Sequence, residues 1–190
     1  EVNVIEILPG GVVTKKAAAH IQLDENGEFV RNPKEDLVKV AVVERHQGTG
    51  NVACGFLKGY GIKEGAVALS VAHDSHNIIV VGVNDEEMEF AVNSLIAQEG
   101  GIVLVKEGKV IEQMPMPIAG LMSDQSGEWV DEKLTSIHEK AYTELGICGD
   151  VEPVMTLCFM SLAVIPEIKL TDMGLFDVTT FSFIPVEISR

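Results

Sequence analysis

The chain contains 190 residues, of which 46% are hydrophobic, so it can bury one core and is too apolar for a disordered chain. Its 29 acidic and 14 basic residues give a formal net charge of −15, which argues against nucleic acid and anionic membrane surfaces as partners. No apolar run approaches the roughly 18 residues of a membrane-spanning helix.

The N-terminal segment is predicted to be extended. Residues 2–8 alternate between apolar and polar side chains, and a Pro-Gly-Gly turn and a second extended stretch follow. The next stretch is charged and contains Asn26-Gly27, a hairpin signal. We therefore divide the chain into residues 1–23 and a main unit, residues 24–190. Because the first residue is Glu and not Met, we expect the chain to be processed or to be part of a longer protein.

The centre of the chain alternates between predicted strands and one helix. Residues 37–45, 65–72 and 77–83 form apolar runs, of which the last two predict strands that are buried on both faces. Residues 85–99 predict a helix that Asn84 caps and Gly100-Gly101 ends. Its apolar stripe consists of Met88, Ala91, Val92, Leu95 and Ile96. Residues 101–118 then predict a strand, a Glu-Gly turn and an edge strand.

The C-terminal part adds a second helix and further strands. Residues 127–145 predict a helix with an apolar stripe from Val130 to Leu145. The apolar run 154–166 is interpreted as a strand, and residues 167–188 as strand, turn and strand. The expected fold class is therefore α+β (mixed α/β), with β-sheets and two main helices packed on them in a layered sandwich.

The most unusual stretch is the polar sequence VAHDSHN, residues 71–77, which lies between two apolar runs. His73 and His76 are three positions apart, so a tight turn would let them converge with Asp74, whereas a strand would separate them. Three interpretations stay open: the side chains satisfy neighbouring backbone groups, they contact a substrate, or they bind a metal.

A metal site at His73 and His76 needs a third protein ligand from another segment. The spacing of the acidic residues in the sequence does not select this third ligand. The candidates are Glu44, Asp74, Asp124 and Asp172. The metal interpretation is the weakest of the three, and no metal ligand is assigned.

The second candidate stretch is ERHQGTGN, residues 44–51, at the end of a predicted strand. Strand ends are where α/β sheets tend to place their sites, although the stretch lacks the phosphate-binding GxxxxGK[ST] pattern. A glycine-rich hairpin with a surface ion pair is the alternative. The residues proposed to lie near a substrate are Arg45, His46, His73, Asp74, His76 and Asn77.

Nucleophilic catalysis has little support in the sequence. There is no GxSxG motif and no zinc deaminase H-x-E…P-C-x-x-C signature. The three cysteines, Cys54, Cys148 and Cys158, are widely separated and form no CxxC. Their odd number indicates reduced thiols and a cytoplasmic protein.

Four stretches together resemble a known family. They are VAVVERHQGTGN, GAVALSVAHDSHNIIVVGVNDEEMEFAVN, MPMPIAGLMSD and SLAVIPEIKLTDMGLFDV, and they resemble, in this order, the C-terminal region of bacterial adenine deaminases. The resemblance extends from about residue 2 to residue 188. It places the chain in the metal-dependent amidohydrolases.

The resemblance implies an enzyme that hydrolyses adenine to hypoxanthine and ammonia in purine salvage. In that family a barrel domain binds two divalent metals, manganese or iron, through an HxH motif and further ligands, and the activated hydroxide attacks the purine. This chain contains no HxH, so we expect it to be inactive alone, with no metal of its own and no catalytic residue. Its implied partners are the barrel domain of the same polypeptide, adenine and further copies in a homo-oligomer.

Two other functions remain open at this point. The chain could be a purely structural or oligomerisation module, with residues 154–166 and the edge-prone MPMPI at a subunit interface. It could also be a stand-alone purine-binding domain. Residues 1–23 are expected to belong to the small β domain that amidohydrolases add to the barrel.

Overall fold

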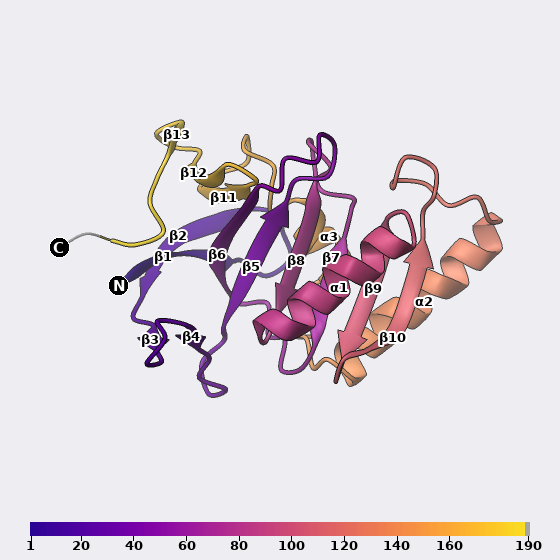
Figure 1. Ribbon diagram of the computed structural model, residues 1–190, viewed down its shortest axis with the longest axis horizontal. Coiled ribbons are helices and arrows are strands. Elements are labelled where there is room, and N and C mark those ends of the chain that lie inside the picture. The colour runs from indigo at the N-terminus through magenta and orange to yellow at the C-terminus, as the bar shows by residue number, and fades with distance from the viewer. Residues whose placement is uncertain (189–190) are drawn as a thin grey trace.

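The computed structural model describes residues 1–188 and places one large sheet at the centre of the molecule (Figure 1). The sheet has eight strands in the order β10-β9-β7-β8-β5-β6-β1-β2, and only the β1–β6 pair is parallel. The strands are β1 (Val2–Ile7), β2 (Thr14–Ala19), β5 (Leu37–Val43), β6 (Val52–Lys58), β7 (Ala66–Leu69), β8 (Ile78–Gly82), β9 (Gly101–Lys106) and β10 (Lys109–Pro115).

Smaller elements cover the two faces of this sheet. Helix α1 (Asp85–Ala97) lies on one face, against β7, β8 and β9. Helices α2 (Gly127–Thr143) and α3 (Pro153–Cys158) lie on the other face, with the three-stranded sheet of β11 (Ile168–Thr171), β12 (Gly174–Asp177) and β13 (Ser182–Phe183). A short hairpin, β3 (Gln22–Leu23) and β4 (Phe29–Val30), completes the fold. The predicted α+β class with layered packing is confirmed.

Local signals account for most elements. The Asn84 side chain accepts a hydrogen bond from the Glu87 N–H at 2.8 Å and starts α1, as its sequence predicts. Strands β7 and β8 are buried throughout, which confirms their prediction as central strands. Pro115 ends the edge strand β10, where a missing N–H donor costs least. Val52–Lys58 forms strand β6.

The predicted strand over residues 154–166 is wrong. Its first part belongs to α3, followed by turns. Pro153 occupies the first turn of α3, where proline favours a helix, and the Glu152 side chain accepts from the Met155 N–H. Only one side of this segment is buried, because Leu157 is fully enclosed while Val164 is 67% exposed.

The N-terminal strands belong to the large sheet. β1 pairs with β6, and the Asn3 N–H donates to the Val186 carbonyl at 2.8 Å, so the first residues lie beside the C-terminal segment. The assignment of residues 1–23 to the small β domain of a longer enzyme stays a prediction. No helix within residues 1–188 has the length and apolar character needed to cross a bilayer.

Candidate functional site

Two loops meet at one end of the central strands and bring the predicted site residues together. The first follows β5 and carries Arg45 and His46, and the second joins β7 to β8 and carries residues 73–77. Because β5 and β8 are neighbours in the sheet, the loop that follows β5 and the loop that precedes β8 lie side by side at the same end of these strands.

Arg45 is the main link between these loops. Its Nε donates to the His76 carbonyl at 2.5 Å, and its backbone N–H donates to Asn77 Oδ1 at 3.3 Å. A terminal guanidinium nitrogen donates to the Ala119 carbonyl at 2.9 Å, so a third loop is attached to the same side chain. Arginine suits this role because its planar group offers several donors in fixed directions.

The two histidines of the turn converge. The His73 and His76 ring centroids are 5.3 Å apart, and His73 also packs against Phe159 at 4.8 Å. The His76 N–H donates to the Ala72 carbonyl at 2.6 Å, which closes the turn, and Asp74 at its tip is exposed. The turn is thus built from backbone bonds, with both imidazoles on one side of it.

His76 is half-buried, and one of its ring nitrogens lacks a hydrogen-bond partner among the described residues. Its Nδ1 is buried and has no partner among the described residues. Burial, together with the nearby His73 and Arg45, lowers the pKa of the His76 imidazole, which favours its neutral form. A buried polar atom without a partner is costly, and such atoms in native proteins often mark functional positions.

His46 and Glu44 order the other loop. His46 Nε2 lies 2.6 Å from the Ser75 carbonyl, and because a carbonyl only accepts, Nε2 carries the proton. The Glu44 carboxylate accepts from the backbone N–H groups of Thr49 at 3.0 Å and Gln47 at 2.7 Å. These bonds lower the pKa of Glu44 to about 2, so it is a carboxylate at neutral pH.

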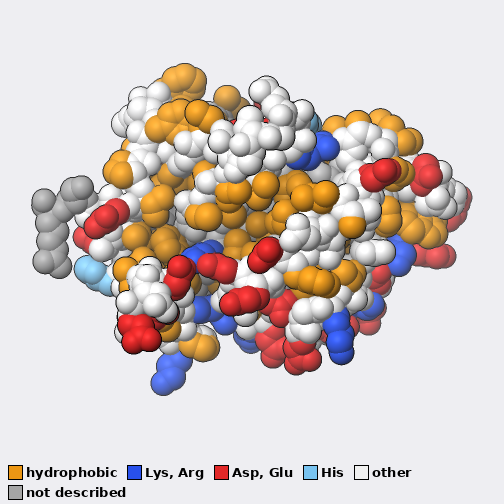
Figure 2. Space-filling view, in the orientation of Figure 1, with side chains coloured by type: hydrophobic (Ala, Val, Ile, Leu, Met, Phe, Trp, Pro, Cys, Tyr) orange, Lys and Arg blue, Asp and Glu red, His pale blue; other side chains and the backbone are white. Residues whose placement is uncertain are grey.

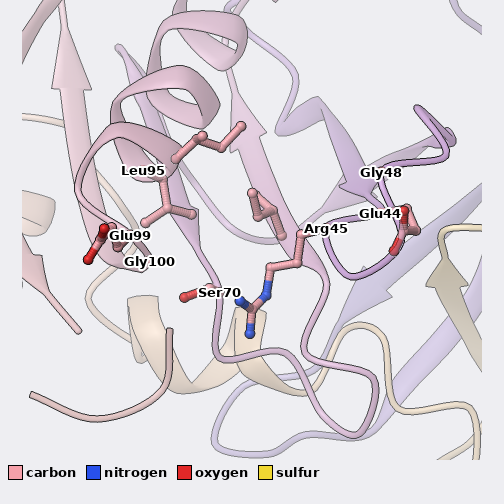
Figure 3. A pocket seen from close by; sticks show the side chains of 9 residues that line it. Glu44, Arg45, Gly48, Ser70, Leu95, Glu99 and Gly100 are labelled. Atoms are coloured by element: carbon pink, nitrogen blue, oxygen red, sulfur yellow. The ribbon is translucent and has the colours of Figure 1, made fainter. Parts of the chain in front are cut away.

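A cavity of about 350 Å³ lies beside Arg45. Figure 3 shows the Arg45 side chain extending toward Ser70, with Glu44 on one wall and Leu95, Glu99 and Gly100 on the other. The volume is within the range of small-molecule sites. Of the six residues predicted to be near a substrate, Arg45 lines this cavity, and the other five form the two loops that hold it.

Ser70 is a residue of this site that sequence reasoning missed. Its side chain is completely buried, and its Oγ donates to the Gly120 carbonyl at 2.5 Å and accepts from the Gly101 N–H at 2.8 Å. A Cβ at Gly100 would lie 2.6 Å from Gly120 Cα, so this close packing requires glycine. Ser70 is the one polar residue of GAVALSVA, and this was the available signal.

The site offers no metal centre of its own. Within residues 1–188, no three His, Cys, Asp or Glu side chains gather as metal ligands. His73 and His76 are therefore a pair without a third ligand, and none of Glu44, Asp74, Asp124 and Asp172 supplies one. The described residues thus do not fit the two-metal centre of the amidohydrolases.

Comparison with known proteins decides the family. The family described as adenine deaminase C-terminal domain matches residues 11–182. Adenine deaminase 2 of Desulfotalea psychrophila is 70% identical over 98% of the chain, and adenine deaminase of Ligilactobacillus salivarius is 48% identical over 99%. The chain belongs to the adenine deaminase C-terminal domain family.

The adenine deaminase relatives are much longer than this chain. It spans about a third of their length, since each alignment covers 32% of the relative. The predicted resemblance is therefore confirmed, as is the interpretation of the chain as a C-terminal domain within a larger polypeptide.

Proposed function

We propose that this chain is the C-terminal third of a full-length adenine deaminase, which converts adenine and water to hypoxanthine and ammonia. In this proposal the domain packs on the metal-binding barrel, manganese or iron stays in that barrel, and the loop at residues 73–77 faces the mouth of the active site. The three cysteines are free, which fits the cytoplasmic location that we propose with it.

The observation that carries the proposal is the arrangement of two loops around the Arg45 side chain and the cavity beside it. One guanidinium holds the His76 carbonyl and the Ala119 carbonyl, and beside it lies a cavity of a size suited to a small heterocycle. A connecting turn needs neither two imidazoles nor a half-buried arginine. The neutral His76, with its free Nδ1, can accept a hydrogen bond from an N–H group of a purine when the loop opens.

Substitution of either histidine tests the proposal in the full-length enzyme. His73→Ala or His76→Ala is expected to lower kcat/KM for adenine more than tenfold, an effect of about 1.4 kcal/mol or more on transition-state binding. His20→Ala is the matched control, because His20 is exposed and lies outside both loops. Normal kinetics in both loop variants, with an unchanged melting temperature, would contradict a role at the active-site mouth.

The isolated chain gives a second test. Because no three ligands gather within residues 1–188, we expect the purified chain with added Mn²⁺ to convert no adenine and to retain no stoichiometric metal. Ultraviolet absorbance follows the conversion, and elemental analysis of the same sample measures the metal. Turnover with metal bound would mean that the His73–His76 pair is itself a metal site.

A structural or oligomerisation role is the alternative proposal. It is favoured by the edge position of β10, whose outer side is open to pairing by another chain, and by exposed apolar residues such as Met155, at 52%. It makes a different prediction for the same histidine variants. They would change oligomer size or melting temperature and leave the turnover of each intact oligomer unchanged.

A further inference from the structure

Part of the sheet face that carries α1 has no covering element. On this face α1 lies against β7, β8 and β9, and the β3–β4 hairpin reaches β6 through the edge-to-face pair of Phe29 and Phe56. Between them, the ends of β5 and β6 are open. Figure 2 shows apolar side chains gathered on the middle of this face, beside α1.

The register of β5 and β6 identifies the open residues. Ala41 pairs with Cys54 and Val43 with Val52, so their side chains are on the same face. That face is the α1 side, because Ala41 and Val43 pack in the cluster that contains the buried side of α1. Val52 is 54% exposed and Cys54 is also exposed, although partial burial raises the pKa of its thiol.

These strands and α1 enclose a groove of about 420 Å³. We name it the β5–α1 groove, and its apolar lining consists of Ala41, Val43, Val52, Val80, Met88 and Val92. Glu89 of α1 supplies a carboxylate at its border, and the Asp85 carboxylate there is paired with Lys39 Nζ at 2.7 Å. It is therefore an apolar channel with an acidic side, which water fills poorly and which a partner surface can cover.

The groove continues into the Arg45 cavity. Val92 lines the groove, and Ile96, one helical turn further along α1, lines the cavity. Ile96 was predicted to be buried with the apolar stripe of this helix, but it is 56% exposed. An apolar surface thus extends from β6 along α1 to the loops at residues 44–51 and 73–77.

We propose that the β5–α1 groove is the surface on which the catalytic part of the full-length adenine deaminase packs. This inference rests on the proposed function and adds the face that makes the contact. In the relatives, about two thirds of the length lies outside the region that this chain matches. In the proposed full-length enzyme, this remaining part of the polypeptide is the segment that would cover the groove. Packing here places the Arg45 cavity at the border of the interface.

Charge disfavours a second copy of this chain as the occupant. Each copy has a formal net charge of −15, and two facing grooves would bring the Glu89 carboxylates of the two copies close to one another. The complementary surface is apolar in its centre and carries Lys or Arg side chains opposite α1. This is the chemistry that we assign to the partner surface of the catalytic part.

Cys54 lies beside the groove on the same sheet face, because it pairs with the lining residue Ala41, so its reactivity reports whether a partner covers this face. We compare the rate of its alkylation by iodoacetamide in the isolated chain and in the full-length enzyme, by mass spectrometry of its peptide. Cys148 is the internal control, since it is exposed and lies in the loop after α2, on the other side of the sheet. We expect the Cys54 rate to fall more than about tenfold in the full-length enzyme, with Cys148 changing less than about twofold.

Two results would overturn the proposal. The first is an unchanged Cys54 rate in the full-length enzyme, or an equal fall at both thiols. The second is an isolated chain that forms a dimer in which Cys54 is protected and becomes reactive on dilution, because a second copy then occupies the groove.

Substitution of Val52 gives an independent test. Val52→Asp is expected to lower the melting temperature of the full-length enzyme more than that of the isolated chain, in which the side chain is already 54% exposed. Val164→Asp, at a position 67% exposed and outside the groove, should change neither. Equal behaviour of the two variants in the full-length enzyme contradicts the proposal.

The histidine variants separate this inference from the proposed function. If Cys54 stays reactive while His73→Ala lowers kcat/KM tenfold, the loop contributes to the active site and the groove is not the interface. If Cys54 is protected while both histidine variants are normal, the groove is the interface and the loop has no role at the active site.

Discussion

Replacement of Lys169 by methionine is expected to stabilise the chain at pH 7 by about 2 kcal/mol. Lys169 is completely buried on β11, and among the described residues its ammonium has a single hydrogen bond, to the Val12 carbonyl at 2.8 Å, and no acidic partner. Burial lowers the pKa of Lys169 to about 8. Methionine has a similar length and carries no charge, so it removes the cost of burying the ammonium.

The magnitude follows from this pKa. A decrease from the ordinary value of 10.5 to about 8 corresponds to about 3 kcal/mol at a pH where the lysine is charged in both states. The lost hydrogen bond to Val12 offsets about 1 kcal/mol of the gain.

The pH dependence of the two proteins distinguishes this mechanism from better packing. Between pH 8 and the unfolded-state pKa, the unfolded chain binds more protons than the folded chain, so the stability of the wild-type chain rises with pH. The Lys169→Met chain lacks this contribution, and its advantage should shrink across the same range. Urea unfolding at several pH values measures the difference in the free energy of unfolding between the two proteins. The titration of other groups is the same in both proteins and cancels in this difference.

The control is Lys34→Met, at an exposed position in the loop after β4. It should change the free energy of unfolding by less than about 0.5 kcal/mol at every pH. Loss of stability in Lys169→Met at pH 7 would show that the ammonium stabilises the fold by holding Val12 and the turn before β2. The expected sign would then be wrong.

The central layers of the fold were predictable because each element carries a local signal. α1 and α2 have caps at Asn84 and Ser126 and apolar stripes of helical period, while β7 and β8 are continuous apolar runs. The sequence of α3 is misleading because a long apolar run is typical of a buried strand, whereas its helix signal rests on the proline in its first turn. Ile96 was misplaced for a tertiary reason, since periodicity cannot show where the partner sheet face is left open.

The candidate site was predictable in its residue types and not in its geometry. Two histidines and an aspartate in a turn are recognisable in the sequence, and so is an arginine at the end of a strand. Their contact is tertiary, because Arg45 and His76 are 31 residues apart and meet through the pairing of β5 with β8. The roles of Ser70 and Ala119 depend on how three loops cross, for which the chain has no local signal.

Glu112→Gln is expected to destabilise the chain by about 2 kcal/mol, because Glu112 attaches α2 to the edge strand β10. Its carboxylate accepts from Lys133 Nζ at 2.8 Å and from Ser136 Oγ at 2.5 Å, and Lys140 Nζ lies 3.2 Å away. Its side chain is only 10% exposed. Glutamine has almost the same size, so the loss reports the charge and its bonds and not the packing.

The loss should itself depend on pH in a defined direction. Burial opposes ionisation, but the bonds from Lys133 and Ser136 outweigh it and lower the pKa of Glu112 to about 2. A carboxyl whose folded-state pKa is depressed stabilises the protein above its unfolded pKa, near 4.5, and loses this contribution as the pH falls toward 2. Wild-type and Glu112→Gln stabilities should therefore differ fully at pH 7 and converge in acid.

Glu132→Gln, on the exposed side of α2, is the matched control and should change the stability little at either pH. A double-mutant cycle of Glu112→Gln with Lys133→Met isolates the contribution of this pair. A coupling energy near zero, or a Glu112→Gln loss that persists unchanged in acid, would assign the effect to the polar contacts of the side chain and not to its charge. A pH-dependent loss would instead show that a buried carboxylate holds α2 on an edge strand that its backbone alone leaves open.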